Sequence, residues 1–145
     1  MKGIRGGSST RGQALVEFAL VLPIFLLLLY GVTEFGRAFL WAHHLANASR
    51  VGCRTATLPG STDTDVNDSI ERFMTNSGFS EDRWSSTIEV KDAEGNVRAG
   101  GLSLSEFGDQ IYVTVTMNMT VFSGSLVPGL RGTIPIRGHC VFRHE

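Results

Sequence analysis

The sequence has little of what enzymes and nucleic-acid-binding proteins depend on. Its 13 basic residues are offset by 14 acidic ones, and the formal net charge is −1. A near-neutral chain offers no basic surface for a phosphate backbone, so nucleic acid is not an expected partner. Neither a glycine-rich phosphate-binding loop nor a GxSxG nucleophile motif occurs. We therefore expect no enzymatic activity, no catalytic residue and no cofactor.

Metal-ligating residues are also scarce. The sequence has two cysteines and four histidines, and no pair of them has CxxC or HxxxH spacing. His43 and His44 fall on the polar side of an expected helix, where no further ligands match them. We therefore expect no metal site.

Charge is scarcest near the amino terminus. Residues 1–12 contain basic residues but no acid, and between 13 and 33 the only charged residue is Glu17. The stretch 14–32 is otherwise apolar, with a length close to the roughly 20 residues of a membrane-spanning helix. Pro23 is compatible with such a helix. We expect 1–12 to be a basic cytoplasmic leader and 13–33 to span the membrane, which leaves the carboxyl-terminal part exported.

A cleaved secretory signal peptide is an alternative interpretation of this segment. Its apolar core would be about 7–15 residues long and would be followed by a small-x-small cleavage site. The run in this chain is longer, and residues 28–33 offer no such site. A single-pass membrane anchor fits better, with the amino terminus cytoplasmic and the rest exported.

The helical pattern continues beyond the expected span. No proline occurs between 33 and 57, and Pro59 then supplies a stop. Apolar and small residues recur with helical period and define one expected buried face, which comprises Phe35, Ala38, Phe39, Ala42, Leu45, Ala46, Ser49, Cys53 and Ala56. We expect one helix over about 13–57, whose second half, 34–57, is amphipathic and needs a covering partner.

The remaining residues predict a short helix and a small sheet. The helix is expected from about Val66 to Asn76, with Asp65 as its N-cap. Alternation of apolar and polar residues predicts strands over 84–90, 109–122 and 133–142. Three or four antiparallel strands cannot bury their apolar face alone. We therefore predict an α+β fold in which domain 58–145 packs on 34–57.

The two cysteines, Cys53 and Cys140, have an expected role in this exported domain. An even count in an oxidising compartment favours a disulfide, which would join the long helix to the last strand. Such a disulfide would close a loop of 86 intervening residues. Loop-entropy estimates give a contribution to stability of about 4 kcal/mol for a loop of this length. Two buried free thiols are the alternative.

Glu17 is the residue that most needs explaining. A charged side chain in hydrocarbon costs about 2.5–3.5 kcal/mol on insertion scales, so it usually indicates a function or a partner. Gly12 lies five residues before it, at the junction of the basic tail and the apolar run, and Phe18 follows it. The simpler alternative is that Gly12 is a linker residue and Glu17 snorkels from the end of an anchor helix.

Three stretches together resemble the TadE-like family of pilin-like proteins from tight-adherence (Flp/Tad) pilus systems. They are Gly12–Pro23, Tyr30–Ala38 and Asn47–Arg54, with Val51 where an acid is common and Cys53 where a small residue is usual. Within the first two stretches, the family-motif positions are Phe18, Pro23, Glu34, Phe35, Gly36 and Arg37. The resemblance implies a pilin-like fold with a long amino-terminal helix. It also implies cleavage between Gly12 and Gln13 by a prepilin peptidase, which makes Glu17 the fifth residue of the mature chain.

This resemblance implies a minor structural or assembly component of a Tad-type pilus, involved in pilus biogenesis and adherence. The implied partners are other pilin-like subunits, the inner-membrane Tad platform, the prepilin peptidase and membrane lipid. Cleavage would create an α-amino group at Gln13, which could neutralise Glu17 of a neighbouring subunit and set the register between helices. The alternative is an uncleaved, single-pass anchored module that binds or scaffolds other proteins in the periplasm or envelope.

Overall fold

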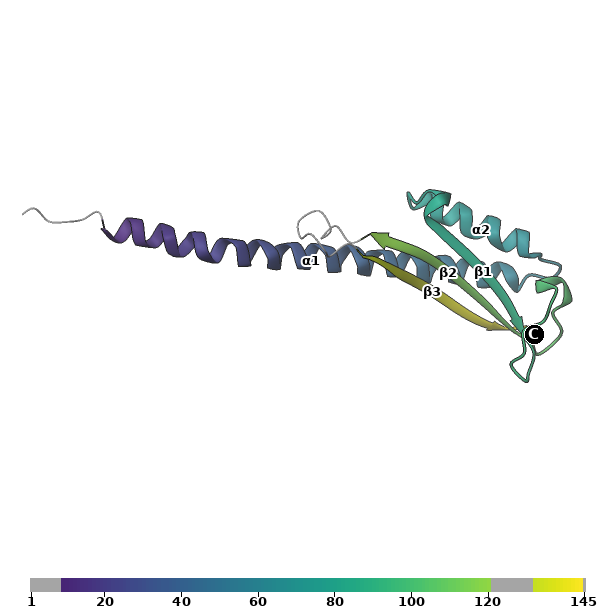
Figure 1. Ribbon diagram of the computed structural model, residues 1–145. Coiled ribbons are helices and arrows are strands. Elements are labelled where there is room, and N and C mark those ends of the chain that lie inside the picture. Colours follow the sequence, from purple (N-terminus) through teal and green to yellow (C-terminus); the bar gives the residue numbers. More distant parts are fainter. Residues whose placement is uncertain (1–8, 121–131, 145) are drawn as a thin grey trace, which may run out of the picture. The chain divides into compact units, whose positions relative to one another are not determined.

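The computed structural model describes residues 9–120 and 132–144 of the chain. Its elements, in order, are helix α1 (Ser9–Ala56), helix α2 (Asp63–Asn76), the short 3-10 helix η1 (Glu81–Arg83), strand β1 (Trp84–Lys91), the short 3-10 helix η2 (Gly101–Leu104), strand β2 (Gln110–Thr120) and strand β3 (Thr133–Arg143) (Figure 1). The chain divides into two compact units, of which the first ends at Gly36 and the second begins at Arg37.

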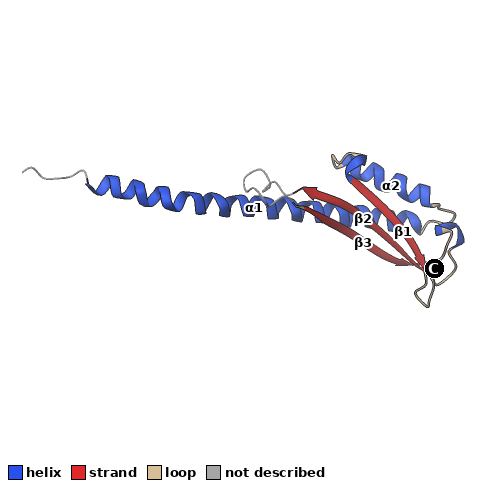
Figure 2. Ribbon diagram, viewed as in Figure 1, coloured by secondary structure: helices blue, strands red, loops and turns tan. Residues whose placement is uncertain are grey.

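The second unit has the predicted α+β fold. Its sheet has the order β1-β2-β3, and both strand pairs are antiparallel. In the central register, Val113 of β2 pairs with Ile88 of β1 on one side and with Cys140 of β3 on the other. The carboxyl-terminal half of α1 and the whole of α2 cover one face of this sheet (Figure 2). The strand order, which the sequence left open, is therefore a simple meander.

The core lies between the sheet and the two helices. Strand β2 alternates as predicted, and its inward side chains are 0–2% exposed: Ile111, Val113, Val115, Met117 and Met119. Helix α2 contributes Val66, Ile70 and Met74, and α1 contributes Leu45, Ala48, Cys53 and Ala56. A three-stranded sheet thus buries its apolar face only because two helices cover it.

Helix α1 approaches the sheet closely at two glycines. A Cβ added at Gly138 of β3 would overlap the backbone carbonyl group of Leu45 in α1. A Cβ at Gly52 would lie 2.8 Å from Ile70 Cδ1 and 2.9 Å from Val113 Cγ1. Both glycines therefore allow the helix backbone to pack where a larger residue would push it away.

The predicted buried face of α1 is wrong at two aromatic positions. Phe35 is 81% exposed and Phe39 is 68% exposed, whereas Ala48 and Gly52 are buried instead. The buried residues that follow Leu45 in α1 are small, in keeping with the close approach of β3 to the helix backbone there. Phe35 also lies in the first unit, which contains no sheet against which it could pack.

Helix boundaries differ from the predicted ones. Helix α1 begins at Ser9 rather than near Gln13. Helix α2 begins at Asp63, and its N-cap is Thr62 rather than Asp65. Thr62 and Asp65 form a capping box, in which the Asp65 backbone N–H donates to Thr62 Oγ1 (3.3 Å) and the Thr62 N–H donates to Asp65 Oδ2 (2.8 Å). This reciprocal pair satisfies two N–H groups that a lone Asp65 cap could not.

The strands agree with the sequence within a few residues. Strand β1 extends one residue beyond the predicted 84–90, and β3 extends one residue beyond 133–142. The predicted end of β2 at residue 122 lies outside the described residues. After β1 the chain turns at 92–96, where the Asp92 side chain accepts hydrogen bonds from the backbone N–H groups of Glu94 and Asn96.

Candidate assembly site on the amino-terminal helix

The part of α1 in the first unit presents apolar side chains on every side. Leu15, Val16 and Leu20 are about 70% exposed, and the large apolar side chains from there to Leu29 are 37–64% exposed. By length and composition, this is the one helix among the described residues that could cross a membrane. No element of the first unit covers these side chains, so they need lipid or other apolar helices around them.

The three predicted residues at the start of this run are all in helical conformation and exposed: Gly12, Gln13 and Glu17. Glu17 makes no hydrogen bond or ion pair with any residue that the structure describes. Residues 13 and 17 are four apart, so they lie on the same face of the helix about one turn from each other. Gln13 and Glu17 therefore lie at the same side of α1.

Phe18 and Pro23 complete the first stretch. Phe18 is 63% exposed, and Pro23 lies inside α1 without interrupting it. Proline leaves one carbonyl group of the preceding turn without its helical N–H donor, a defect that membrane helices tolerate. Both positions therefore remain available to neighbouring helices rather than to the chain's own fold.

The second stretch contains a local contact and a long-range contact. The Tyr30 hydroxyl donates to Glu34 Oε1 (3.3 Å), one turn along the helix. Arg37 begins the second unit, and its Nη2 donates to the carbonyl oxygen of Thr120 at the end of β2 (3.2 Å). Between them, Phe35 and Gly36 are exposed. This hydrogen bond from Arg37 therefore joins α1 to the end of β2.

The third stretch, Asn47–Arg54, is the seam that packs on the sheet. Ala48, Ser49, Gly52 and Cys53 are buried, whereas the side chains of arginines 50 and 54 are exposed. The small residues in this stretch thus have a packing role, because they allow the close contacts with β2 and β3 described above.

The fold brings the two cysteines together. Cys53 on α1 is buried, Cys140 on β3 faces the helix, and both are free thiols in this structure. Burial raises the pKa of the Cys53 thiol to about 12, and the adjacent Cys140 thiol contributes to the rise. The cysteines are therefore neighbours, as the prediction requires, while the disulfide itself stays a prediction.

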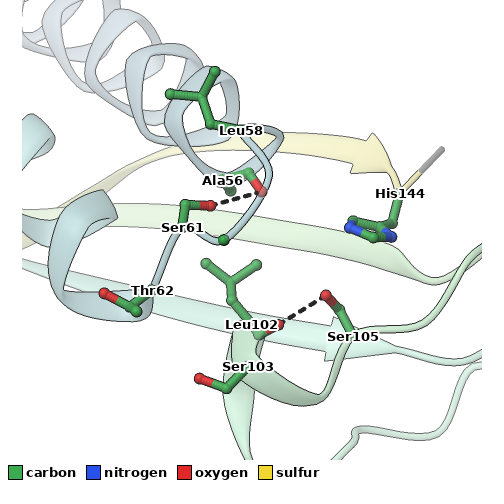
Figure 3. A pocket seen from close by; sticks show the side chains of 9 residues that line it. Ala56, Leu58, Ser61, Thr62, Leu102, Ser103, Ser105 and His144 are labelled. Atoms are coloured by element: carbon green, nitrogen blue, oxygen red, sulfur yellow. Dashed lines mark hydrogen bonds between the residues drawn. The ribbon is translucent and has the colours of Figure 1, made fainter.

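A cavity of about 360 Å³ lies at the end of α1, lined mainly by small and polar side chains (Figure 3). No pattern in the sequence indicates this cavity. Its Ser61 and Ser105 hydroxyls already donate to the carbonyl oxygens of Ala56 and Leu102, at 3.2 and 2.8 Å. Across the described ranges, no group of three His, Cys, Asp or Glu side chains could hold a metal ion. The cavity thus shows no nucleophile–base pair or ligand cluster.

Comparison with known proteins matches only the amino-terminal region. The family model described as TadE-like protein matches residues 12–54, which includes the apolar run and the seam of α1 but not α2 or the sheet. No curated protein and no solved structure matches the chain. The family is a structural one associated with Tad pili, and its match includes every residue of the three stretches above. Over residues 12–54 the chain is therefore similar to the TadE-like family.

Proposed function

We propose that this protein is a minor pilin-like subunit that helps to build a Tad-type pilus and contributes to adherence. The observation that carries the proposal is Glu17, an exposed carboxylate within an apolar helical segment that matches the TadE-like family. It lacks a partner among the described residues, and a carboxylate in lipid needs one. The partner would come from another subunit.

The proposed partner is the α-amino group that leader cleavage creates. A prepilin peptidase cuts between Gly12 and Gln13, which removes the basic residues and leaves an amine one turn from Glu17 on its own helix. The amine of one subunit then meets Glu17 of its neighbour and satisfies both groups in the bilayer. This pairing fixes the axial register between helices, because a shift by one turn would separate the charges.

The rest of the molecule has a supporting role in this proposal. The 13–33 segment crosses the inner membrane from a cytoplasmic amino terminus, and the α+β unit lies in the periplasm. There Cys53 and Cys140 form a disulfide that joins α1 to β3. The apolar side chains of α1 pack against other pilin-like subunits or against the inner-membrane platform.

Glu17 variants test the assembly role. Glu17→Ala removes the carboxylate and Glu17→Gln keeps its shape without the charge, so both variants are expected to lose pilus-dependent adherence at unchanged protein level. Leu27→Val is a matched control that alters an exposed apolar residue of the same run, outside the three family-like stretches, and keeps the charge. Normal adherence in a correctly processed Glu17→Ala strain would overturn the assembly role of this carboxylate.

An uncleaved single-pass anchor is the second candidate, and one observation favours it. Helix α1 begins at Ser9 and runs without a break through Gly12 and Gln13. A peptidase would have to unwind this turn before cutting it, although Gly12 lowers the cost of doing so. In this case Glu17 would reach the membrane surface by snorkelling and would have no partner subunit.

A further inference from the structure

A cluster of aromatic and arginine side chains lies at the end of the second unit where that unit begins, at Arg37. The Cζ atoms of Arg37 and Arg83 are 5.3 and 5.7 Å from the centroid of the Trp41 ring. The ring of Phe79 is edge-on to Trp41, with 6.0 Å between their centroids. These four residues form the Trp41 cluster. Arg83 and Phe79 belong to the segment between α2 and β1, so the cluster exists only in the folded unit.

The cluster is close to the apolar run along the chain. Arg37 follows residue 32 by five positions and Trp41 follows it by nine, which at helical rise is about 8 and 14 Å. The headgroup layer beyond the hydrocarbon core is about 5–8 Å deep on each side. Long side chains on a helix also point back toward its amino terminus. The guanidinium group and the indole ring are therefore within reach of the headgroups.

Exposed apolar side chains lie at the same end of the second unit as the cluster. Phe39 and Leu40 of α1 are 68% and 54% exposed, and Ile134 of β3 is 55% exposed. Ile134 lies at the same end of the unit. It follows Thr133, which pairs with Thr120 in the sheet. The carbonyl oxygen of Thr120 in turn accepts the hydrogen bond from Arg37. Aromatic and aliphatic groups beside arginines are typical of surfaces that rest at a membrane interface.

The charges at this end are of both signs. Glu81 and Asp82 precede Arg83 in η1, so the turn offers carboxylates as well as a guanidinium group. A phospholipid headgroup that carries a phosphate and an amine, or a phosphate among neutral groups, complements this pattern better than a polyanion does. The arginines suit the phosphate, and the indole ring suits the layer between hydrocarbon and water.

We propose that the Trp41 cluster seats the exported α+β unit on the phospholipid headgroups of the periplasmic face of the membrane. Arg37 and Arg83 contact lipid phosphates, and Trp41 with Phe39 lies at headgroup level. The inference rests on the membrane insertion of α1 in the proposed function. Arg83 belongs to the folded unit, so its contact with lipid phosphate restrains the whole unit and not only helix α1. This contact lasts until partner subunits replace the lipid.

Quenching of Trp41 by labelled lipid tests the proposal. The full chain with Trp84→Phe retains Trp41 as its only tryptophan and is reconstituted in phosphatidylethanolamine–phosphatidylglycerol vesicles. One set of vesicles carries a nitroxide on the headgroup and another carries it deep in the acyl chain. Headgroup nitroxides are expected to quench Trp41 at least about twice as strongly as deep ones. Arg83→Gln is expected to weaken the association of the unit with the headgroups by about five-fold, which is the effect of removing one arginine near an anionic lipid surface.

Arg54→Gln is the matched control, because Arg54 is an exposed arginine of α1 far beyond the cluster. It should leave the quenching unchanged. If Trp84→Phe does not fold, the difference in quenching between the wild-type chain and Trp41→Phe reports the same ring. Vesicle flotation and resistance to alkaline carbonate score insertion of α1 in the same samples.

The outcomes separate the two proposals. A chain that floats and resists carbonate, but whose Trp41 is not quenched by headgroup nitroxides, overturns the seating alone. Equal loss of quenching in Arg83→Gln and Arg54→Gln also overturns it, since the contact would then be unspecific. A chain that fails to float overturns the membrane anchor and the seating with it. Quenching that disappears only when other pilin-like subunits are added supports replacement of lipid by partners.

Discussion

Gly138 and Gly52 set the distance between α1 and the sheet at the scale of single residues. Each lies where an added methyl group would meet neighbouring atoms, and at Gly138 these atoms belong to the helix backbone around Leu45. Backbone cannot rotate away as a side chain can, so the position at Gly138 is the less tolerant of the two.

Gly138→Ala is therefore expected to destabilise the second unit by about 1–3 kcal/mol, the usual cost of overpacking. For a unit of this size, each kcal/mol lowers the Tm by about 4–8 °C. Gly132→Ala is the matched control, because an added Cβ there meets no atom within 4 Å. Thermal unfolding of the two variants in detergent gives the comparison. Equal Tm values would show that α1 does not approach β3 as closely as the structure indicates.

Cys53 makes the reduced protein sensitive to alkali. Its pKa is raised from 9.0 to about 12 in the folded chain, chiefly by burial, so the folded state holds the thiol proton more tightly than the unfolded state does. The associated stability is complete below pH 9 and is lost as the pH rises toward 12. With dithiothreitol present, the Tm of the wild-type protein should fall over this pH range. The Tm of Cys53→Ser should fall less steeply. Identical pH profiles would contradict the burial of this thiol.

Helix α2 is an element whose start depends on a reciprocal side-chain cap. Thr62 and Asp65 satisfy each other's backbone N–H groups, and the hydrogen bonds from Thr62 lower the pKa of Asp65 below 3.8. A depressed carboxyl pKa stabilises the fold above pH 3.8 and ceases to do so as the pH falls through the folded value. The cap should therefore weaken in acid.

Thr62→Ala is expected to cost about 1 kcal/mol, the usual contribution of an N-cap hydroxyl. Thr62→Ser keeps the hydroxyl group and should restore most of that loss, whereas Thr64→Ala alters an exposed threonine in the same turn and should be nearly neutral. Urea unfolding at pH 7 and at pH 3 measures all three variants. A Thr62→Ala cost that is as large at pH 3 as at pH 7 would contradict the role assigned to the Asp65 carboxylate.

The elements show what the sequence could and could not predict. Strand β2 was predictable because its alternation extends over the whole strand, and α1 was predictable because apolar residues recur without proline beyond Pro23. The buried face of α1 was not fully predictable, since Phe35 and Phe39 follow the helical period and yet are exposed. A one-dimensional pattern records periodicity but not the distance to the partner surface.

The whole molecule combines an uncovered apolar helix segment with an α+β unit that has its own core. The residues of the candidate assembly site were recognisable because they lie close together in the sequence: Gly12, Gln13, Glu17 and Phe18. The Trp41 cluster was not recognisable, because Arg83 and Trp41 are far apart along the chain and meet only after folding. The same is true of the proximity of Cys53 and Cys140, which the sequence predicts only from their number and compartment.

The mature amino terminus is the most direct test of the central claim, that Glu17 enters the membrane to meet an amine created by cleavage. Intact-mass and terminal-peptide spectrometry of the protein purified from membranes gives the first residue, with and without the prepilin peptidase. We predict a chain that begins at Gln13 when the peptidase is present and at the leader when it is absent. A membrane form that retains residues 1–12 in both strains would contradict the account, because no amine would then exist beside Glu17.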